Sequence, residues 1–229
     1  MSRTCLLTVD IHSYWRHGTG KASGAHLDAL VDRNEYGMPF VSGKMLKGLL
    51  RDAVNRLQDW GRLSDFSGDQ PGLSESEFDD SPVPAGSMVR ALFGTPGMSE
   101  SESRPTPRSF SRSGILRVSD ARLPVAVERY LSDEPRSGLR KSLFRELHST
   151  AIDHTHLVAK EHSLRSIEVC VPMVLTAEIA QLRQAEEHEM VISAHWPEIL
   201  KRACHLIPAI GSNRNRGFGR ATLSLEEKG

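Results

Sequence analysis

The chain has 229 residues, of which 38% are hydrophobic and 25% are charged, ordinary values for one globular domain with its own hydrophobic core. Its 29 basic and 29 acidic residues cancel, which excludes a protein that coats nucleic acid through net positive charge alone. No apolar run approaches the ~20 residues of a membrane span, no export signal stands at the start, and three widely spaced cysteines do not favour a disulfide framework. We therefore expect a cytoplasmic protein with no membrane partner.

The first half of the chain contains one predicted strand and the strongest helix signal. Residues Cys5 to Trp15 alternate in polarity and are rich in β-branched and aromatic side chains, which predicts a strand. From Gly43 to about Trp60 apolar residues recur at helical spacing, and Ser42 can cap the N-terminus of this helix. Ser, Pro, Gly and charged residues then predominate from about 61 to 114, so we expect a long irregular insertion there.

The second half adds further strands and one more helix. The regular elements then run strand, helix, strand, strand, helix, strand, which is the ferredoxin-like order and predicts a single α+β domain over 1–229. The predicted elements are strand material at Ile115–Val127 interrupted by Pro124, an extended hairpin at Ile152–Val169, a strand at Val169–Ala180, an amphipathic helix at Trp196–Leu206 and a last strand at Arg220–Leu225.

A basic face marks the start of the first predicted helix. Lys44, Lys47 and Arg51 are spaced three and four residues apart, opposite the apolar stripe. A P-loop is excluded because Met45 stands where the magnesium-binding Ser or Thr belongs. Free helix amides and two lysines can instead hold a phosphate, although a solvated basic face explains the same residues. Gly48 costs a helix ~1 kcal/mol relative to Ala, which we interpret as close approach by another backbone.

A glycine- and arginine-rich segment, Gly211 to Ala221, is the second candidate. Its glycines and asparagines permit positive φ, its arginines can bind phosphates, and its phenylalanine can stack on a base. Arg216 to Gly219 matches the first half of the RRM aromatic motif. A plain turn with charged residues is the alternative. The candidate RNA-binding residues are Asn213, Arg214, Arg216, Phe218 and Arg220.

Four histidines, His148, His154, His156 and His162, fall close together within the predicted hairpin or just before it. Their spacing matches no zinc pattern and no cysteine stands near them, so we interpret them as solvent-facing residues near a polyanion rather than as metal ligands.

Two carboxylates, Asp28 and Asp32, follow the glycine-rich loop after the first strand. A carboxylate near an RNA phosphate can help to bind Mg²⁺ and position a water molecule. Single aspartates in loops are more often turn formers, so the residues alone leave this role open.

Taken in order, these segments resemble the RAMP superfamily of CRISPR-associated proteins, and most closely the backbone subunits of type III effector complexes. The resemblance extends over nearly the whole chain. The motifs that carry it are HLDALVDRNEYGMPFVSGKMLKGLLRDAV, ALFG at 91–94, RVSDARL at 117–123, STAIDHTHLVAKEHSLRSIEVCVPM and IGSNRNRGFGR.

The resemblance implies a ferredoxin-like or RRM-like palm with an inserted thumb hairpin at about 148–168 and long irregular insertions. It implies a subunit that polymerises along a guide RNA, with target RNA, copies of itself and other CRISPR effector subunits as partners. Asp28 falls where such backbones carry the aspartate that cleaves target RNA with Mg²⁺. The residues that would contact RNA are Lys44, Lys47 and Arg51 on the helix, His154 and Lys160 on the thumb, and the candidate residues of the terminal loop.

We therefore expect a guide-RNA-binding backbone subunit that cleaves bound target RNA at regular intervals. One alternative is a metal-independent endoribonuclease that processes guide RNA, with His17 or His26 as the general base. Another is a non-catalytic RRM-like RNA-binding protein that works alone.

Overall fold

The computed structural model describes residues 3–18, 30–66, 88–94, 113–153, 155–156, 158–160, 163–186 and 189–228. Asp28, His26, His154 and His162 lie outside these ranges. Among the described residues, no helix is both long and apolar enough to cross a membrane.

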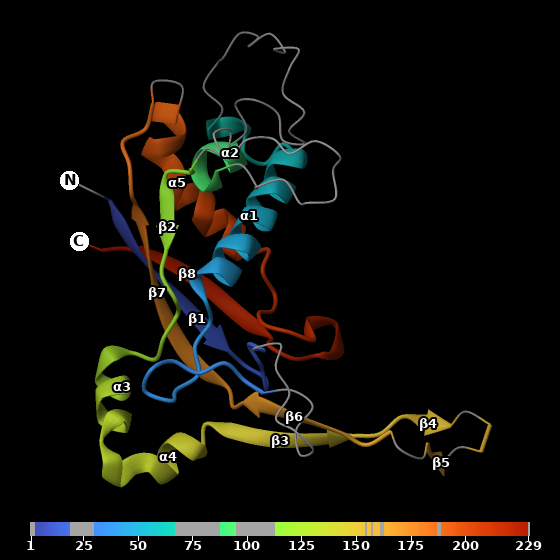
Figure 1. Cartoon of the computed structure of the whole chain (residues 1–229). Coiled ribbons are helices and arrows are strands. Elements are labelled where there is room, and N and C mark those ends of the chain that lie inside the picture. The colour runs from blue at the N-terminus through green and yellow to red at the C-terminus, as the bar shows by residue number, and fades with distance from the viewer. Residues whose placement is uncertain are drawn as a thin grey trace, which may run out of the picture.

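An antiparallel four-stranded sheet forms the centre of the molecule (Figure 1). Its strand order is β2-β7-β1-β8, so the first and third strands of the sheet in sequence lie side by side at its centre. Leu7 of β1 faces Ala177 on one side and Leu225 on the other. This arrangement confirms the predicted ferredoxin-like α+β fold. The strands are β1 (Thr4–Ile11), β2 (Leu116–Val118), β7 (Met173–Gln181) and β8 (Ala221–Glu227).

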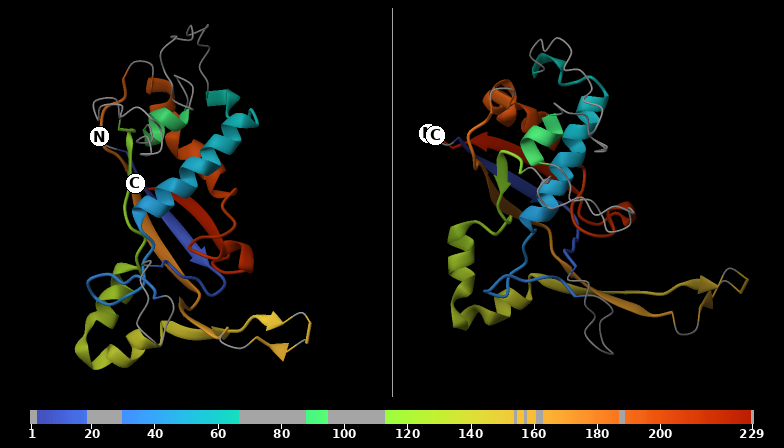
Figure 2. Two further views of the ribbon diagram at one scale, coloured as in Figure 1. Left: turned by 45° about the vertical axis from the view of Figure 1, so that its right-hand side comes forward. Right: turned by 45° about the horizontal axis from the view of Figure 1, so that its top comes forward.

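Two long helices, α1 (Gly43–Asp59) and α5 (Met190–Cys204), pack against each other and cover one face of this sheet (Figure 2). Alternate residues of β1 from Cys5 to Ile11 are buried in the same core. The N-terminus of α1 lies where the sequence predicts it, because the Ser42 hydroxyl accepts a hydrogen bond from the Met45 amide.

The prediction of an irregular stretch between 61 and 114 is wrong for two segments that the structure describes. Ser64–Phe66 forms the 3-10 helix η1, and Met88–Phe93 forms the helix α2 between α1 and α5. Every residue of α2 except Arg90 is buried. A helix this short is stabilised by tertiary packing and not by its own propensity, which is why its polar flanks conceal it in the sequence.

The region after β2 also differs from the prediction of a single interrupted strand. Pro124 stands at the N-cap of a helix, α3 (Val125–Ser132), where a missing amide costs nothing. The 3-10 helix η3 (Glu134–Arg136) and α4 (Ser137–Lys141) follow, and the sequence analysis predicts neither.

Helix α5 begins at Met190 and not at the predicted Trp196. Met190 and Val191 are exposed and only Ile192 of the first turn is buried, so the helical spacing of apolar residues is weak there. Pro197 lies inside the helix and is buried.

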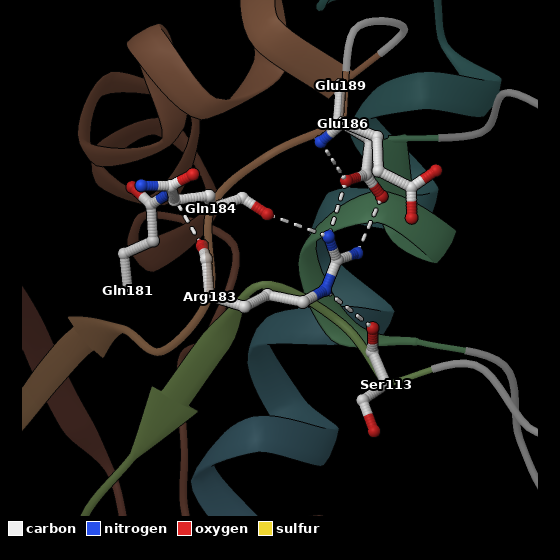
Figure 3. Close-up of polar contacts among 6 residues, drawn as sticks. All are labelled: Ser113, Gln181, Arg183, Gln184, Glu186 and Glu189. Atoms are coloured by element: carbon white, nitrogen blue, oxygen red, sulfur yellow. Dashed lines mark hydrogen bonds and ion pairs between the residues drawn. The ribbon is translucent and has the colours of Figure 1, made fainter.

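A buried ion pair fixes the connection from β7 to α5 (Figure 3). Arg183 binds the Glu189 carboxylate through two hydrogen bonds of 2.8 Å each, and the Glu189 side chain is only 2% exposed. The same carboxylate accepts a hydrogen bond from the Glu186 amide, and Arg183 Nε donates to the Ser113 carbonyl. The pair therefore ties the start of the β2 segment to the start of α5.

A long hairpin projects from one end of the sheet. The C-terminus of α1 and the N-terminus of α5 lie at the opposite end of the molecule (Figures 1 and 2). We call this hairpin the thumb. Its outgoing and returning strands are antiparallel, and Cys170 ends the returning strand only two residues before β7 begins at Met173. The predicted continuous strand at Val169–Ala180 is thus divided between thumb and sheet at Val171 and Pro172. The thumb consists of β3 (Phe144–Ser149) paired with β6 (Arg165–Cys170), and of β4 (Ile152–Asp153) paired with β5 (Val158–Ala159).

Candidate nucleic-acid interface

The glycine- and arginine-rich terminal loop packs on the stretch 12–18, which follows β1. The Ser212 amide donates to the Arg16 carbonyl across 2.9 Å, and the Gly219 amide donates to the Tyr14 carbonyl across 2.8 Å. The predicted strand Cys5–Trp15 therefore ends early, at Ile11, and its last residues support a loop rather than a sheet neighbour.

Two glycines give the terminal loop its shape. Gly211 and Gly219 have φ of 77° and 67°, a region that favours glycine. A Cβ on Gly219 would lie 1.9 Å from the Ile210 carbonyl oxygen, and one on Gly211 would lie 2.4 Å from the Arg16 carbonyl oxygen. The backbone thus packs too closely for any other residue, and the loop is held in one conformation.

This conformation presents the basic side chains of the loop to solvent. Arg214 and Arg216, in the 3-10 helix η5 (Arg214–Arg216), and Arg220 are exposed and form no ion pair within the described residues. Asn213 precedes them in the left-handed region with φ of 60°. Phe218 is half-buried. The loop therefore offers three uncompensated guanidinium groups, which suit phosphate oxygens.

The N-terminus of α1 is already occupied by protein groups. The Gly43 amide donates to the Asp120 carboxylate across 2.8 Å, while the Ser42 hydroxyl and carbonyl accept from the Met45 and Leu46 amides. The free amides that the sequence suggests for phosphate binding are thus mostly satisfied. Any phosphate at this end of α1 must bind chiefly through side chains.

The three basic residues of α1 differ in their surroundings. Lys44 is exposed, whereas Lys47 and Arg51 are half-buried. Lys47 Nζ donates to the Leu116 carbonyl at 3.5 Å, and burial, together with the nearby Arg51 charge, lowers the pKa of Lys47. The predicted close approach of another backbone to Gly48 is wrong: a Cβ there would meet nothing within 4 Å among the described residues.

His17, within the stretch 12–18, contacts the segment that leads into α1. Its ring lies edge-on to Phe40, with centroids 5.8 Å apart, and its Nδ1 is buried with no hydrogen-bond partner in the described part of the chain. Burial lowers the pKa of His17, although Asp32 and Asp120 oppose the shift.

Both ends of the segment that contains Asp28 meet at the base of the thumb. Gly18 forms a β-bridge with Val31, and the Val31 amide donates to the Glu168 carboxylate of β6 across 3.1 Å. Trp15 also pairs with Cys170 at the end of β6. Asp28 itself lies outside the described residues, but the points at which its segment leaves and rejoins the fold are fixed.

The thumb carries the remaining candidates. Lys160 is exposed near the tip of the hairpin, which the views place away from α1 (Figures 1 and 2). His148 Nδ1 lies 2.7 Å from the Ser166 hydroxyl, and the hydrogen bond of His156 to Asp153 lowers the pKa of that carboxylate. Within the described ranges, no three His, Cys, Asp or Glu side chains gather in a way that could hold a metal.

The structure thus joins the terminal loop, the start of α1 and the base of the thumb through the stretch 12–18. Sequence patterns did not reveal two residues of this junction, Asp120 and Glu168. The only sign of Glu168 in the sequence is an acidic residue between the apolar Ile167 and Val169.

Comparisons with known proteins identify one family by sequence and several solved structures with a similar fold. The family model of the RAMP superfamily matches residues 8–222, while no curated protein matches the chain in sequence. In structure, the chain is similar to a chain of the type III-B Cmr-beta complex in its apo state, with a TM-score of 0.56 and 12% identity over 97% of this chain and 96% of that one. The same complex bound to cognate target RNA gives a TM-score of 0.56 and 11% identity over the same shares. A chain of a type IV-B CRISPR complex gives 0.54 and 17% identity over 97% of this chain and 90% of that one.

Proposed function

The chain belongs to the RAMP superfamily, and we propose on that ground that it is a guide-RNA-binding backbone subunit of a type III-like CRISPR ribonucleoprotein. The observation that carries the proposal is the terminal loop, which packs on the stretch 12–18 and exposes Arg214, Arg216 and Arg220. His17 of the same stretch contacts Phe40, three residues before α1, and the proposal places the loop arginines and Lys44 on one basic surface.

Such a surface suits an RNA backbone. Arginine and lysine side chains that neutralise phosphates release condensed counterions, and this release supplies most of the sequence-independent affinity for nucleic acid. Gly211 and Gly219 fix the backbone path of the loop, and its exposed arginine side chains are available to phosphates. Guide RNA is bound whatever its sequence, which phosphate contacts permit.

The proposed partners are guide RNA, target RNA, further copies of the chain and other CRISPR effector subunits. The similarity to subunits of type III-B and type IV-B complexes, one of them bound to cognate target RNA, supports this assignment.

Cleavage of the target strand is a further part of the proposal, with Asp28 as the catalytic residue. Support comes from the described ends of its segment, Gly18 and Val31, which meet at the base of the thumb beside the proposed RNA path. One or two carboxylates together with phosphate oxygens are the usual ligands of Mg²⁺ in proteins, and Asp32 is a second carboxylate close to the same junction. Mg²⁺ bound there would stabilise negative charge that develops on the scissile phosphate.

The experiment for guide binding is purification of the full chain from its native cells, followed by sequencing of the RNA bound to it. We expect RNA of defined length with repeat-derived ends. A variant with Arg214→Ala and Arg216→Ala should retain much less of this RNA while it remains folded. Recovery of random cellular RNA, or of none, would refute guide binding.

A further inference from the structure

A depression of about 180 Å³ lies at the base of the thumb, and no residue of α1 or of the terminal loop lines it. It forms where β3 and β6 meet the end of α4 and the segment that follows Val31. The residues that line it are Arg33, Lys141, Phe144, Arg145, Glu146 and Glu168.

Arg33 is held in a fixed orientation at this depression. Its Cζ lies 3.9 Å from the centroid of the Phe144 ring, so one face of the guanidinium packs on the aromatic side chain. Its Nη2 donates to Glu168 Oε1 across 2.5 Å. The Glu168 side chain is 10% exposed, whereas 42% of the Arg33 side chain remains exposed.

Glu168 is itself fixed by a second contact. Its other carboxylate oxygen accepts a hydrogen bond from the Val31 amide, so the carboxylate is satisfied on both sides. The guanidinium plane of Arg33 is consequently set by a buried acid and a buried ring before any ligand arrives. A group ordered in advance loses little conformational entropy when it binds.

The remaining charges of the depression favour an anion. Arg33 compensates Glu168, which leaves two exposed cations, Lys141 and Arg145, against one exposed carboxylate, Glu146. A flat, partly exposed guanidinium beside two cations is chemically matched to a nucleotide, because guanidinium planes stack on bases and ammonium or guanidinium groups bind phosphates.

We propose that Arg33, backed by Phe144, is a stacking platform for one unpaired nucleobase of a bound RNA, and that Lys141 and Arg145 hold the adjacent phosphate. The inference rests on the proposed RNA-binding function and adds a site to it. Every base has a π-face, so this platform accepts any of the four bases.

The test uses the full chain and short single-stranded RNAs that carry one 2-aminopurine, placed at a different position in each RNA. In wild type we expect one position, or a regular series of positions, at which the fluorescence is quenched by stacking. Arg33→Lys keeps the positive charge but removes the plane, and it should abolish this quenching and weaken binding about tenfold. Phe144→Leu keeps an apolar side chain and should have the same effect, and it serves if Arg33→Lys proves unstable.

Arg136 supplies a matched control. Its Cζ lies 3.8 Å from the Tyr130 ring centroid and it pairs with Asp133, so it is stacked and ion-paired like Arg33 but lies outside the depression. Arg136→Lys should leave the quenching unchanged. Quenching that persists in folded Arg33→Lys and Phe144→Leu, or wild-type RNA binding without any quenched position, would overturn the platform while RNA binding stands. A wild-type chain that binds no RNA would overturn both.

Discussion

The first amide of α1, on Gly43, donates a 2.8 Å hydrogen bond to the carboxylate of Asp120. The positive end of the helix dipole is therefore already matched with a negative charge from the protein. Binding of RNA phosphates at this end of α1 must depend on the basic side chains, and the first prediction tests that dependence.

Lys44→Ala should weaken RNA binding equally for all sequences, because Lys44 is exposed and is proposed to contact phosphate rather than bases. The slope of log K against log[salt] should fall by about 0.7 for the lost contact. Lys47→Ala should add a similar change. Binding titrations at several salt concentrations measure the slope. Lys201→Ala on α5, whose ammonium lies 4.0 Å from Glu198, is the control and should leave it unchanged. An unaltered slope in Lys44→Ala would remove this residue from the interface.

Phe218→Ala should reduce RNA affinity by ~1–3 kcal/mol if the ring stacks on a base. The ring is half-buried, so part of its effect can come from folding. The melting temperature and the affinity of the same preparation separate the two effects. A stable variant with weakened binding supports stacking, and a parallel loss of both identifies Phe218 as a packing residue.

Asp28→Ala should abolish cleavage of the target strand and leave target binding intact, because one carboxylate adds little to the affinity for a polyanion. Gel analysis of target RNA cut by the assembled complex in Mg²⁺ measures this, with the ladder from wild type as the reference. Asp32→Ala determines whether the neighbouring carboxylate shares the role. Cleavage that survives EDTA would instead favour the metal-independent reaction with His17 or His26 as the base. A wild-type complex that binds target and never cuts it would disprove nuclease activity.

Arg183→Met should destabilise the fold by about 3 kcal/mol, because it removes the guanidinium that compensates the charge of the buried Glu189 carboxylate. The control is Arg3→Met, which removes one member of the exposed pair Arg3–Glu227 and should cost less than ~1 kcal/mol. Urea unfolding of the three proteins gives both differences. Equal costs would show that the Arg183 pair is no more important than a surface pair.

Sequence patterns predicted those elements whose structure is determined by interactions between residues close in the sequence. Helix α1 begins where Ser42 can cap it, and its apolar spacing defines the buried face. The order of strands and helices predicted the ferredoxin-like palm. Helix α2 was missed because its stability derives from packing between α1 and α5, of which a short apolar run among polar residues gives no sign.

The candidate site was predictable only in part, for a related reason. Basic and glycine-rich segments are visible in the sequence, so the terminal loop and the face of α1 were identified. The contacts that assemble them are long-range: Asp120 reaches Gly43 from the other side of an insertion, and Glu168 reaches Val31 from the end of the thumb. No regular sequence spacing relates such residues, so their contacts are visible only in the three-dimensional structure.

The two-residue link between β6 and β7 has a mechanical consequence. Val171 and Pro172 are too few to form a slack tether, and the ring of Pro172 restricts one of the few dihedral angles available. A load applied to the thumb therefore passes directly into β7, which lies next to β1 at the centre of the sheet. A change in the direction of the thumb is therefore expected to shift β7, and with it the centre of the palm sheet.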